Sequence, residues 1–385
     1  MKILFSSFTC KINSGSESET SFQILFCALK LGYKVTLVTQ EKHLPKIYEN
    51  IPPQYLLNLD SIAIRPPGIL GIRFLRDKNI SLYIRYLHFQ HKVGNLIKRY
   101  SPQDFNIVHH TSFGNIWLPI GLRKSSIPIV IGPIGGMGRI PMKLWKYLGL
   151  LGIINEISHR VFSFVGFQIF GKKILKSAQY ILSANLSDMK LFSKYSANIV
   201  LKPHPVFDSR HDLANYESLS KSDRIVYAGR LIPWKGLVVL LHAFQSIAPD
   251  FNLIIIGKGP DLNRLKKISK RKGLENRVTF MGELPRSEVI NYLKTARLVV
   301  NPSFRDSSGW LLAEAMSLGV PVTGFNLNGV GTVLKISGIA GLDYDRNPEE
   351  ELSKALTKSD SLGDISNFNA EHMSNLLDKI YKMSY

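Results

Sequence analysis

One segment of the sequence combines two cations with a glycine turn, as sites that bind phosphate often do. The segment is RIVYAGRLIPWKGLVVLLHAF, residues 224–244. Its β-branched start predicts a strand, and its apolar end from Leu237 predicts a helix. Between them, Gly229 permits close backbone approach, the helix start supplies unpaired N–H groups, and Arg230 and Lys235 can neutralise a diphosphate. The simpler alternative is a strand-to-helix turn with two solvated cations.

The next hundred residues repeat this strand–turn–helix pattern. The predicted strands with their turns are residues 253–259, 278–282, 298–303 and 319–323, and the predicted helices are 261–272, 287–296 and 310–318. This alternation predicts a parallel α/β sheet covered on both faces, in which ligands bind beyond the carboxyl ends of the strands. Gly229, Gly257, Gly282 and Ser303 all fall at such ends, so one crevice could collect them.

Four motifs, in this order and spacing, make residues 222–345 resemble the nucleotide-sugar domain of the glycosyl transferases group 1 family. They are GRLIPWKG (229–236), IIGKGP (255–260), VTFMGELP (278–285) and NPSFRDSSGWLLAEAMSLGVPV (301–322). Members of this family are retaining glycosyltransferases with the GT-B fold, in which two Rossmann-like parallel-sheet domains face a central cleft. The resemblance implies a nucleotide-sugar donor and metal-independent chemistry without a cofactor. It also implies that Arg230 and Lys235 bind the donor diphosphate and that Glu314 binds the donor ribose.

The sequence departs from the family at the first glutamate of the last motif, where Asp306 stands eight residues before Glu314. In the family that glutamate contacts the transferred sugar, so Asp306 is expected to keep the charge on a side chain one methylene shorter. The alternative is that Asp306 caps the helix that starts near Trp310. The remaining donor contacts are expected from Gly257, Gly259, Gly282, Ser307, Ser308, Gly309 and Trp310.

Two further stretches are candidates from the N-terminal half. The loop between a strand at 1–5 and a helix at 20–31 carries Gly15, which is expected to approach the donor, or else belongs to a plain Ser/Gly turn. The glycine-rich stretch 127–138 indicates a cleft loop at Gly135 and Gly136, or else a tightly packed turn.

The predicted strand 106–110 ends in two adjacent histidines, His109 and His110. Members of the family often carry a histidine here that faces the reacting sugar. Because neighbouring residues of a strand face opposite sides, only one of the pair can do so. A core histidine satisfied by the backbone is the alternative.

Charge is concentrated in the N-terminal half. The chain carries a net charge of +20; residues 1–205 contain 26 Lys and Arg against 9 Asp and Glu, while the remainder contains 23 against 20. A surface of one sign suits anionic partners such as membrane lipids, lipid pyrophosphates or nucleic acid. No recognisable motif supports nucleic acid as a partner.

Residues 139–176 mix large apolar side chains with cations at both ends. Glu156, His159 and Arg160 interrupt the run, so a segment lying on a membrane surface is predicted rather than a spanning helix. Side chains expected to enter lipid are Trp145, Tyr147, Phe162, Phe164 and Phe167, and lysines expected to meet anionic headgroups are Lys143, Lys146, Lys172, Lys173 and Lys176. The alternative is a buried helical pair with solvated cations.

Several absences narrow the prediction. The sequence shows no signal-peptide pattern, no metal-ligating cluster, and only Cys10 and Cys27, which fits a reducing compartment. The predicted domains are residues 1–205, which bind the acceptor, and 206–365, which bind the nucleotide-sugar, with a last helix, 366–385, that could cross back to the first domain. We expect a cytoplasmic glycosyltransferase, peripheral at the inner face of the cell membrane, that extends a lipid-linked glycan in bacterial surface polysaccharide synthesis. The alternatives are a non-hydrolysing sugar-nucleotide epimerase and a degenerate member that binds nucleotide-sugar at the membrane.

Overall fold

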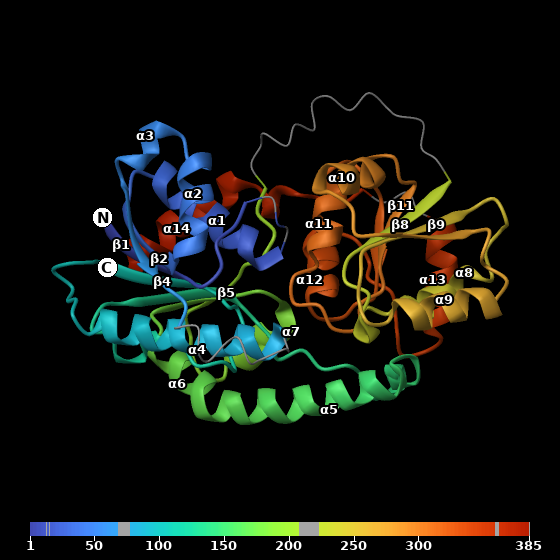
Figure 1. Cartoon of the computed structure of the whole chain (residues 1–385), viewed down its shortest axis with the longest axis horizontal. Helices are drawn as coiled ribbons and strands as arrows, with labels where there is room; N and C mark the ends of the chain where they lie inside the picture. The colour runs from blue at the N-terminus through green and yellow to red at the C-terminus, as the bar shows by residue number, and fades with distance from the viewer. Residues whose placement is uncertain (13, 15, 68–77, 208–222, 359–361, 385) are drawn as a thin grey trace. The chain divides into compact units, whose positions relative to one another are not determined.

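The chain forms two compact units, each built around one parallel sheet (Figure 1). The computed structural model describes residues 1–12, 14, 16–67, 78–207, 223–358 and 362–384. Unit 1 consists of Met1–Met137, Phe162–Val206 and Ala370–Tyr385, and unit 2 of Gly138–Val161 and Phe207–Asn369. This division differs from the expected one because Gly138–Val161 packs with unit 2. The reason is that Ile140, Leu144, Tyr147 and Leu148 join the hydrophobic core of that unit.

The sheet of unit 1 has seven strands in the order β3-β2-β1-β4-β5-β6-β7, and every neighbouring pair is parallel. The strands are β1 (Lys2–Ser7), β2 (Lys34–Gln40), β3 (Leu59–Ile64), β4 (Ile107–Ser112), β5 (Ile129–Ile134), β6 (Tyr180–Ser183) and β7 (Ile199–Leu201). Strands β1, β4 and β5 are buried almost throughout, which agrees with their continuous apolar sequences.

Helices flank both sides of this sheet. They are α1 (Ser16–Lys30), α2 (Leu44–Asn50), α3 (Pro53–Leu56), α4 (Lys78–Ile97), α6 (Lys172–Ser177), α7 (Leu186–Phe192) and α14 (Ala370–Ser384), with short turns η1 (Glu41–His43), η2 (Gly121–Lys124) and η4 (Phe167–Gly171). The C-terminal helix α14 packs beside α1, where Tyr33 Oη donates a hydrogen bond to Asp378 at 2.5 Å. The end of the chain therefore belongs to the N-terminal unit.

Unit 2 contains a five-stranded parallel sheet in the order β10-β9-β8-β11-β12. Its strands are β8 (Arg224–Ala228), β9 (Asn252–Ile256), β10 (Val278–Gly282), β11 (Leu298–Asn301) and β12 (Val322–Gly324). Its helices are α8 (Leu237–Phe244), α9 (Leu262–Arg271), α10 (Arg286–Lys294), α11 (Trp310–Ser317), α12 (Asn328–Ile336) and α13 (Pro348–Thr357), with turns η3 (Met142–Tyr147), η6 (Pro233–Lys235) and η7 (Ser366–Phe368). The predicted alternation of strands and helices is confirmed.

Helix α5 (Gly149–Gly166) carries residues of both units, with Gly149–Val161 in unit 2 and Phe162–Gly166 in unit 1. Its buried positions include Gly152, Glu156, Ser163 and Gly166, which are small or polar. Its exposed positions are large and apolar; they include Leu150, Leu151, Ile154, Ile157, Val161, Phe162, Phe164 and Val165. This is the reverse of the usual amphipathic surface helix. Within the part of the chain that the structure describes, no helix is long and apolar enough to cross a membrane.

The strand ends of unit 2 approach one another so closely that they require glycine. Gly257 has φ +131°, and a Cβ added there would lie 1.9 Å from the carbonyl oxygen of Gly229 at the end of the neighbouring strand. We predict that Gly257→Ala lowers the free energy of unfolding by about 2–4 kcal/mol, because two backbone segments would have to separate. Urea unfolding followed by circular dichroism measures this loss.

Gly273 is the matched control for this substitution. It also has a left-handed φ, +65°, but no atom lies within 4 Å of its added Cβ. Gly273→Ala should therefore cost only the backbone strain, about 1 kcal/mol. Equal losses in the two variants would contradict the close approach of the strand ends.

Candidate functional site: the strand ends of unit 2

An ion pair between Lys235 and Asp306 lies at the centre of the candidate site. Lys235 ends the η6 turn after β8, and its Nζ lies 2.5 Å from Asp306 Oδ2 in the loop after β11. The two side chains are 15% and 11% exposed. Burial would raise the pKa of Asp306, but the charge and hydrogen bond of Lys235, with hydrogen bonds from Ser308 and Asn301, hold it well below its usual range. A carboxylate and an ammonium thus face each other, both ionised at neutral pH.

Asp306 also organises the loop before helix α11. Its Oδ1 accepts hydrogen bonds from the backbone N–H of Ser308 at 3.1 Å and of Gly309 at 3.3 Å, and from Ser308 Oγ at 3.2 Å. Gly309 has φ +59°, a conformation that favours glycine. The contacts are those of the capping alternative. Asp306 therefore caps this loop and binds Lys235 at the same time.

Other expected donor residues gather at adjacent strand ends of the same sheet. Gly229 follows β8, Gly257 follows β9, and Gly282 ends β10, where its carbonyl accepts the Gly257 N–H at 2.7 Å. A Cβ at Gly259 would lie 2.1 Å from the Leu231 carbonyl oxygen. The glycines therefore allow these turns to lie against one another.

The remaining expected donor residues differ in accessibility. Arg230 is exposed, and its side chain makes no hydrogen bond or ion pair with the described residues. Ser307 is exposed as well, whereas Trp310 is buried against Phe207, with ring centroids 5.5 Å apart. The cation of Arg230 thus remains open to solvent, while Lys235 is held in place by Asp306.

Glu314, expected at the donor ribose, is 5% exposed and paired with Arg286 at the start of α10. Arg286 Nη1 donates to Glu314 Oε2 at 2.9 Å, and Nη2 contacts Oε1, so the pair is bidentate. Sequence reasoning missed Arg286. The pair accounts for a buried carboxylate in the apolar helix α11, and it fixes the direction of that carboxylate.

Both histidines of β4 lie inside the sheet of unit 1 and have no exposed surface. His109 bonds through Nδ1 to Tyr381 Oη at 2.5 Å and through Nε2 to the Gly132 carbonyl at 3.0 Å. His110 Nδ1 lies 3.2 Å from Ser6 Oγ. Burial lowers the pKa of His109 to about 4 and that of His110 to about 3. This is the geometry of core histidines, and it does not support the expected position of either at a reacting sugar.

The glycine-rich loop after β5 is a packed turn. The Gly135 N–H donates to the Gly114 carbonyl at 2.6 Å, and a Cβ at Gly135 would lie 2.8 Å from Asp188 Oδ2. Gly136 has φ +92° and packs against Asn115. The alternative of a tight turn therefore describes Gly135 and Gly136, and it holds this loop close to the end of β4.

Gly15 lies outside the described residues, but helix α1, which follows it, brings Glu17 to the end of β4. Glu17 Oε1 accepts the Gly114 N–H at 2.5 Å. Burial raises the pKa of Glu17 to about 7, although the hydrogen bond from Gly114 acts in the opposite direction. A carboxyl group that titrates near neutral pH can take up or release a proton in a reaction. Sequence reasoning missed Glu17, whose only signal was its place in the first glycine loop.

The residues expected at a membrane surface fall into two groups. Phe162 and Phe164 are exposed, by 65% and 52%. Tyr147 and Phe167 are buried in the protein core, so the prediction that they enter lipid was wrong; the apolar cores of the two units cover them. Trp145 is partly buried, and its Nε1 donates to the Ile140 carbonyl at 3.2 Å.

The expected lysines lie beside α5 in the sequence and reach solvent to different degrees. Lys143 and Lys146 are exposed in η3, and Lys143 forms a solvent-exposed pair with Asp345 at 3.4 Å. At the other end, Lys173 is exposed, while Lys172 is half-buried, with its Nζ 5.5 Å from the centre of the Tyr195 ring. Cations therefore flank the exposed apolar surface of the helix at both ends.

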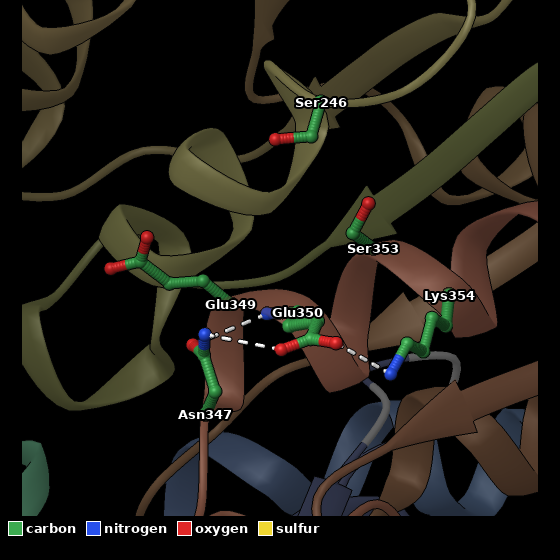
Figure 2. Close-up of a pocket in the computed structure, with 6 residues that line it drawn as sticks. All are labelled: Ser246, Asn347, Glu349, Glu350, Ser353 and Lys354. Atoms are coloured by element: carbon green, nitrogen blue, oxygen red, sulfur yellow. Dashed lines mark hydrogen bonds and ion pairs between the residues drawn. The ribbon is translucent and has the colours of Figure 1, made fainter.

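A separate hollow of about 240 Å³ lies near the far end of α8 and is lined by Ser246, Asn347, Glu349, Glu350, Ser353 and Lys354 (Figure 2). Its polar groups pair among themselves: Glu350 contacts Lys354 at 2.6 Å and accepts hydrogen bonds from Asn347. Ser246 follows the C-terminus of α8, whereas Lys235 precedes its N-terminus. The hollow is therefore distinct from the site at the strand ends. Among the described residues, no group of three or more His, Cys, Asp or Glu side chains could hold a metal ion.

Comparison with known proteins agrees with this geometry. Residues 209–361 match the family model described as glycosyl transferases group 1. An uncharacterised glycosyltransferase of Methanocaldococcus jannaschii is 24% identical over 228 residues, which cover 54% of this chain and 56% of that protein. A phosphatidylinositol N-acetylglucosaminyltransferase of Arabidopsis thaliana is 24% identical over 204 residues, 52% of this chain and 43% of that protein. The chain thus spans about half the length of the curated relatives it matches.

The fold has relatives among solved structures. The crystal structure of Anabaena HepE in complex with UDP-glucose has a TM-score of 0.62 at 14% identity, with 99% of both chains covered. Two parallel-sheet α/β units with this likeness define the GT-B class, which confirms the predicted fold. Through its C-terminal domain the chain belongs to the glycosyl transferases group 1 family.

The raised pKa of Glu17 makes stability depend on pH. The folded protein retains a proton on Glu17 up to about pH 7, whereas in the unfolded chain the group titrates near 4.5. Wild-type protein should therefore lose stability as pH rises through this window. Because Glu17→Gln cannot ionise, we predict that its melting temperature rises relative to wild type between pH 5 and pH 8.

Thermal unfolding at pH 5, 6, 7 and 8 measures this difference. Glu19→Gln, two residues along the same helix, corrects for changes common to any carboxylate removed from the start of α1. A difference between Glu17→Gln and wild type that stays constant across the series would contradict the raised pKa.

Proposed function

We propose that this protein is a retaining glycosyltransferase that moves a sugar from a nucleotide-sugar to a lipid-linked glycan acceptor in surface polysaccharide synthesis. The observation that carries the proposal is the buried Lys235–Asp306 pair at the strand ends of a group 1 glycosyltransferase domain. Such a pair keeps an ammonium group at a fixed place where the leaving diphosphate of a donor would need it. HepE was solved with UDP-glucose, so UDP-sugars are the first donors to test.

The charges at the strand ends suit the bond that breaks. As the bond between the anomeric carbon and the diphosphate oxygen lengthens, negative charge develops on that oxygen and positive charge on the sugar ring. Lys235, the exposed Arg230 and the N–H groups at the start of α8 would stabilise the leaving oxygen. Asp306 would keep Lys235 in place before the donor arrives and then lie near the developing positive charge.

Retention of configuration follows if the acceptor attacks from the face that the diphosphate leaves. The acceptor oxygen forms the new bond to the anomeric carbon, the diphosphate takes the electrons of the old bond, and the hydroxyl proton passes to a leaving phosphate oxygen. This route requires no protein base and no metal ion. It is consistent with the burial of His109 and His110 in the sheet.

Helix α5 supports an acceptor anchored in a membrane. A contiguous exposed apolar face is unfavourable in water, and Leu151 and Leu150 are 80% and 74% exposed. The flanking lysines Lys143, Lys146 and Lys173 would meet anionic headgroups at the inner face of the membrane. The relative from Arabidopsis carries phosphatidylinositol in its name, and phosphatidylinositol is a lipid.

The donor site predicts the effect of Lys235→Ala. Loss of a charge-assisted contact with the diphosphate should weaken nucleotide affinity by about 10- to 100-fold, since such contacts contribute about 1.5–3 kcal/mol, and sugar transfer should fall below detection. A thermal-shift screen with UDP-, GDP-, ADP- and dTDP-sugars measures binding, and radiolabelled sugar offered to membrane lipid extracts measures transfer.

Lys258→Ala is the matched control, because Lys258 lies at the end of the neighbouring strand β9 but is 70% exposed and pairs with Glu283. It should keep the thermal shift of wild type. Near-normal transfer by Lys235→Ala would remove the diphosphate assignment. Conversion of a free UDP-sugar without acceptor would indicate an epimerase, and donor binding without transfer would indicate a degenerate binding protein.

The membrane contact predicts binding to anionic vesicles. The variant with Leu151→Ser, Ile154→Ser and Phe162→Ser should bind phosphatidylglycerol vesicles more than tenfold less tightly than wild type, because each buried apolar side chain contributes about 1.5–3 kcal/mol. Co-sedimentation with vesicles measures the binding. Leu57→Ser, at a position 91% exposed on unit 1, controls for general loss of surface apolarity. Equal binding of wild type and the triple variant would contradict the role of α5.

A further inference from the structure

Arg305, the residue before Asp306, forms a buried cluster that the proposed chemistry does not use. Its side chain is 13% exposed, and Nη1 donates to Glu156 Oε2 at 2.5 Å. Its Nη2 donates to Asn155 Oδ1 at 3.1 Å, and the guanidinium lies 4.8 Å from the centre of the Trp234 ring. Three segments of unit 2 therefore meet at one side chain: helix α5, the η6 turn and the loop after β11.

Glu156 on α5 is the buried partner that holds Arg305. It has no exposed surface, and its Oε1 accepts hydrogen bonds from Arg160 Nε at 2.8 Å and from the Ile140 N–H at 3.0 Å. Both carboxylate oxygens are thus engaged. A buried ion pair of this kind is seldom more stabilising than apolar side chains of the same volume, but it fixes direction and register. The pair is therefore better explained by what it positions than by stability.

The η6 turn is held against the same helix. A Cβ added at Gly152 would lie 2.7 Å from Pro233 Cβ, so the helix and the turn that ends in Lys235 pack without space for a side chain. The carbonyl of Trp234 accepts the Phe304 N–H at 2.9 Å, which joins the turn to the loop. Helix α5 therefore contacts both segments that carry the Lys235–Asp306 pair.

We propose that Glu156 and Arg305 are positioning residues for the donor site. Glu156 orients Arg305, and Arg305, held between Glu156 and the Trp234 ring, keeps the loop at 303–309 in the conformation that places Asp306 against Lys235. This role rests on the proposed donor site, and it gives the single carboxylate within the apolar α5 segment a function. Neither side chain touches the donor; each acts through the backbone of the loop.

The test uses Arg305→Gln, Glu156→Gln and the double variant of the full chain. Amide hydrogen exchange of residues 304–309 reports on the loop without any ligand, and calorimetry with UDP reports on the site. Each single substitution should speed loop exchange and weaken UDP binding by about tenfold, the size expected when coupled neighbours lose their interaction. Because the two residues act together, the double variant should be no worse than the worse single variant. Arg305→Lys should recover part of both properties.

Arg264→Gln is the matched control. Arg264 donates to the Leu148 and Tyr147 carbonyls at 2.8 Å and 2.7 Å, so it anchors the start of the same helix, but among the described residues it makes no hydrogen bond with the loop. It should lower the melting temperature while leaving loop exchange and UDP affinity within about twofold of wild type.

Two results would overturn the positioning role. In the first, Arg264→Gln speeds loop exchange as much as Arg305→Gln does. In the second, Arg305→Gln, or Arg305→Lys if the former does not fold, leaves loop exchange unchanged. Failure of wild-type protein to bind UDP would count against the donor nucleotide instead, because loop exchange is measured without ligand.

Discussion

The contact between Lys235 and Asp306 is the interaction on which the candidate site depends. It joins the turn after β8 to the loop after β11, two neighbouring strands of one parallel sheet. The low pKa of Asp306 follows from Lys235 and from backbone and side-chain N–H groups, so the loop and the ion pair stabilise each other. A short aspartate serves here because the carboxylate must reach the Ser308 and Gly309 amides and Lys235 together. The glycines at the strand ends allow the remaining turns to approach.

Helix α5 is the second unusual feature, because its apolar side chains face solvent while a carboxylate is buried. The two properties have one explanation if the outer face meets lipid and the inner face contacts the donor loops. Glycine at 152 and the buried Glu156 give close and directional contact on the inside. The outside then needs large apolar residues between flanking lysines. An ordinary core-facing helix would satisfy neither requirement.

Much of unit 2 could be predicted because parallel strands leave continuous apolar runs and their turns need glycine. Strand β10 has the bounds that the sequence indicated, and the others differ by a few residues at their ends. The prediction failed where packing decided the outcome. Tyr147 and Phe167 have the composition of lipid-facing residues but are covered by the protein. His109 looked like a site residue, yet Tyr381, 272 residues away, takes one of its ring nitrogens.

The sequence by itself determined the alternation of strands and helices, the family of the C-terminal domain and the cations that could bind a diphosphate, because these depend on local periodicity and on short motifs. Only the tertiary structure decided which charges are paired. Glu156 with Arg305 and Glu314 with Arg286 join residues 149 and 28 positions apart. Glu17 acquires its raised pKa from burial beside Gly114. Burial and partners at long range set the energy of a charge, and neither can be read from neighbouring residues.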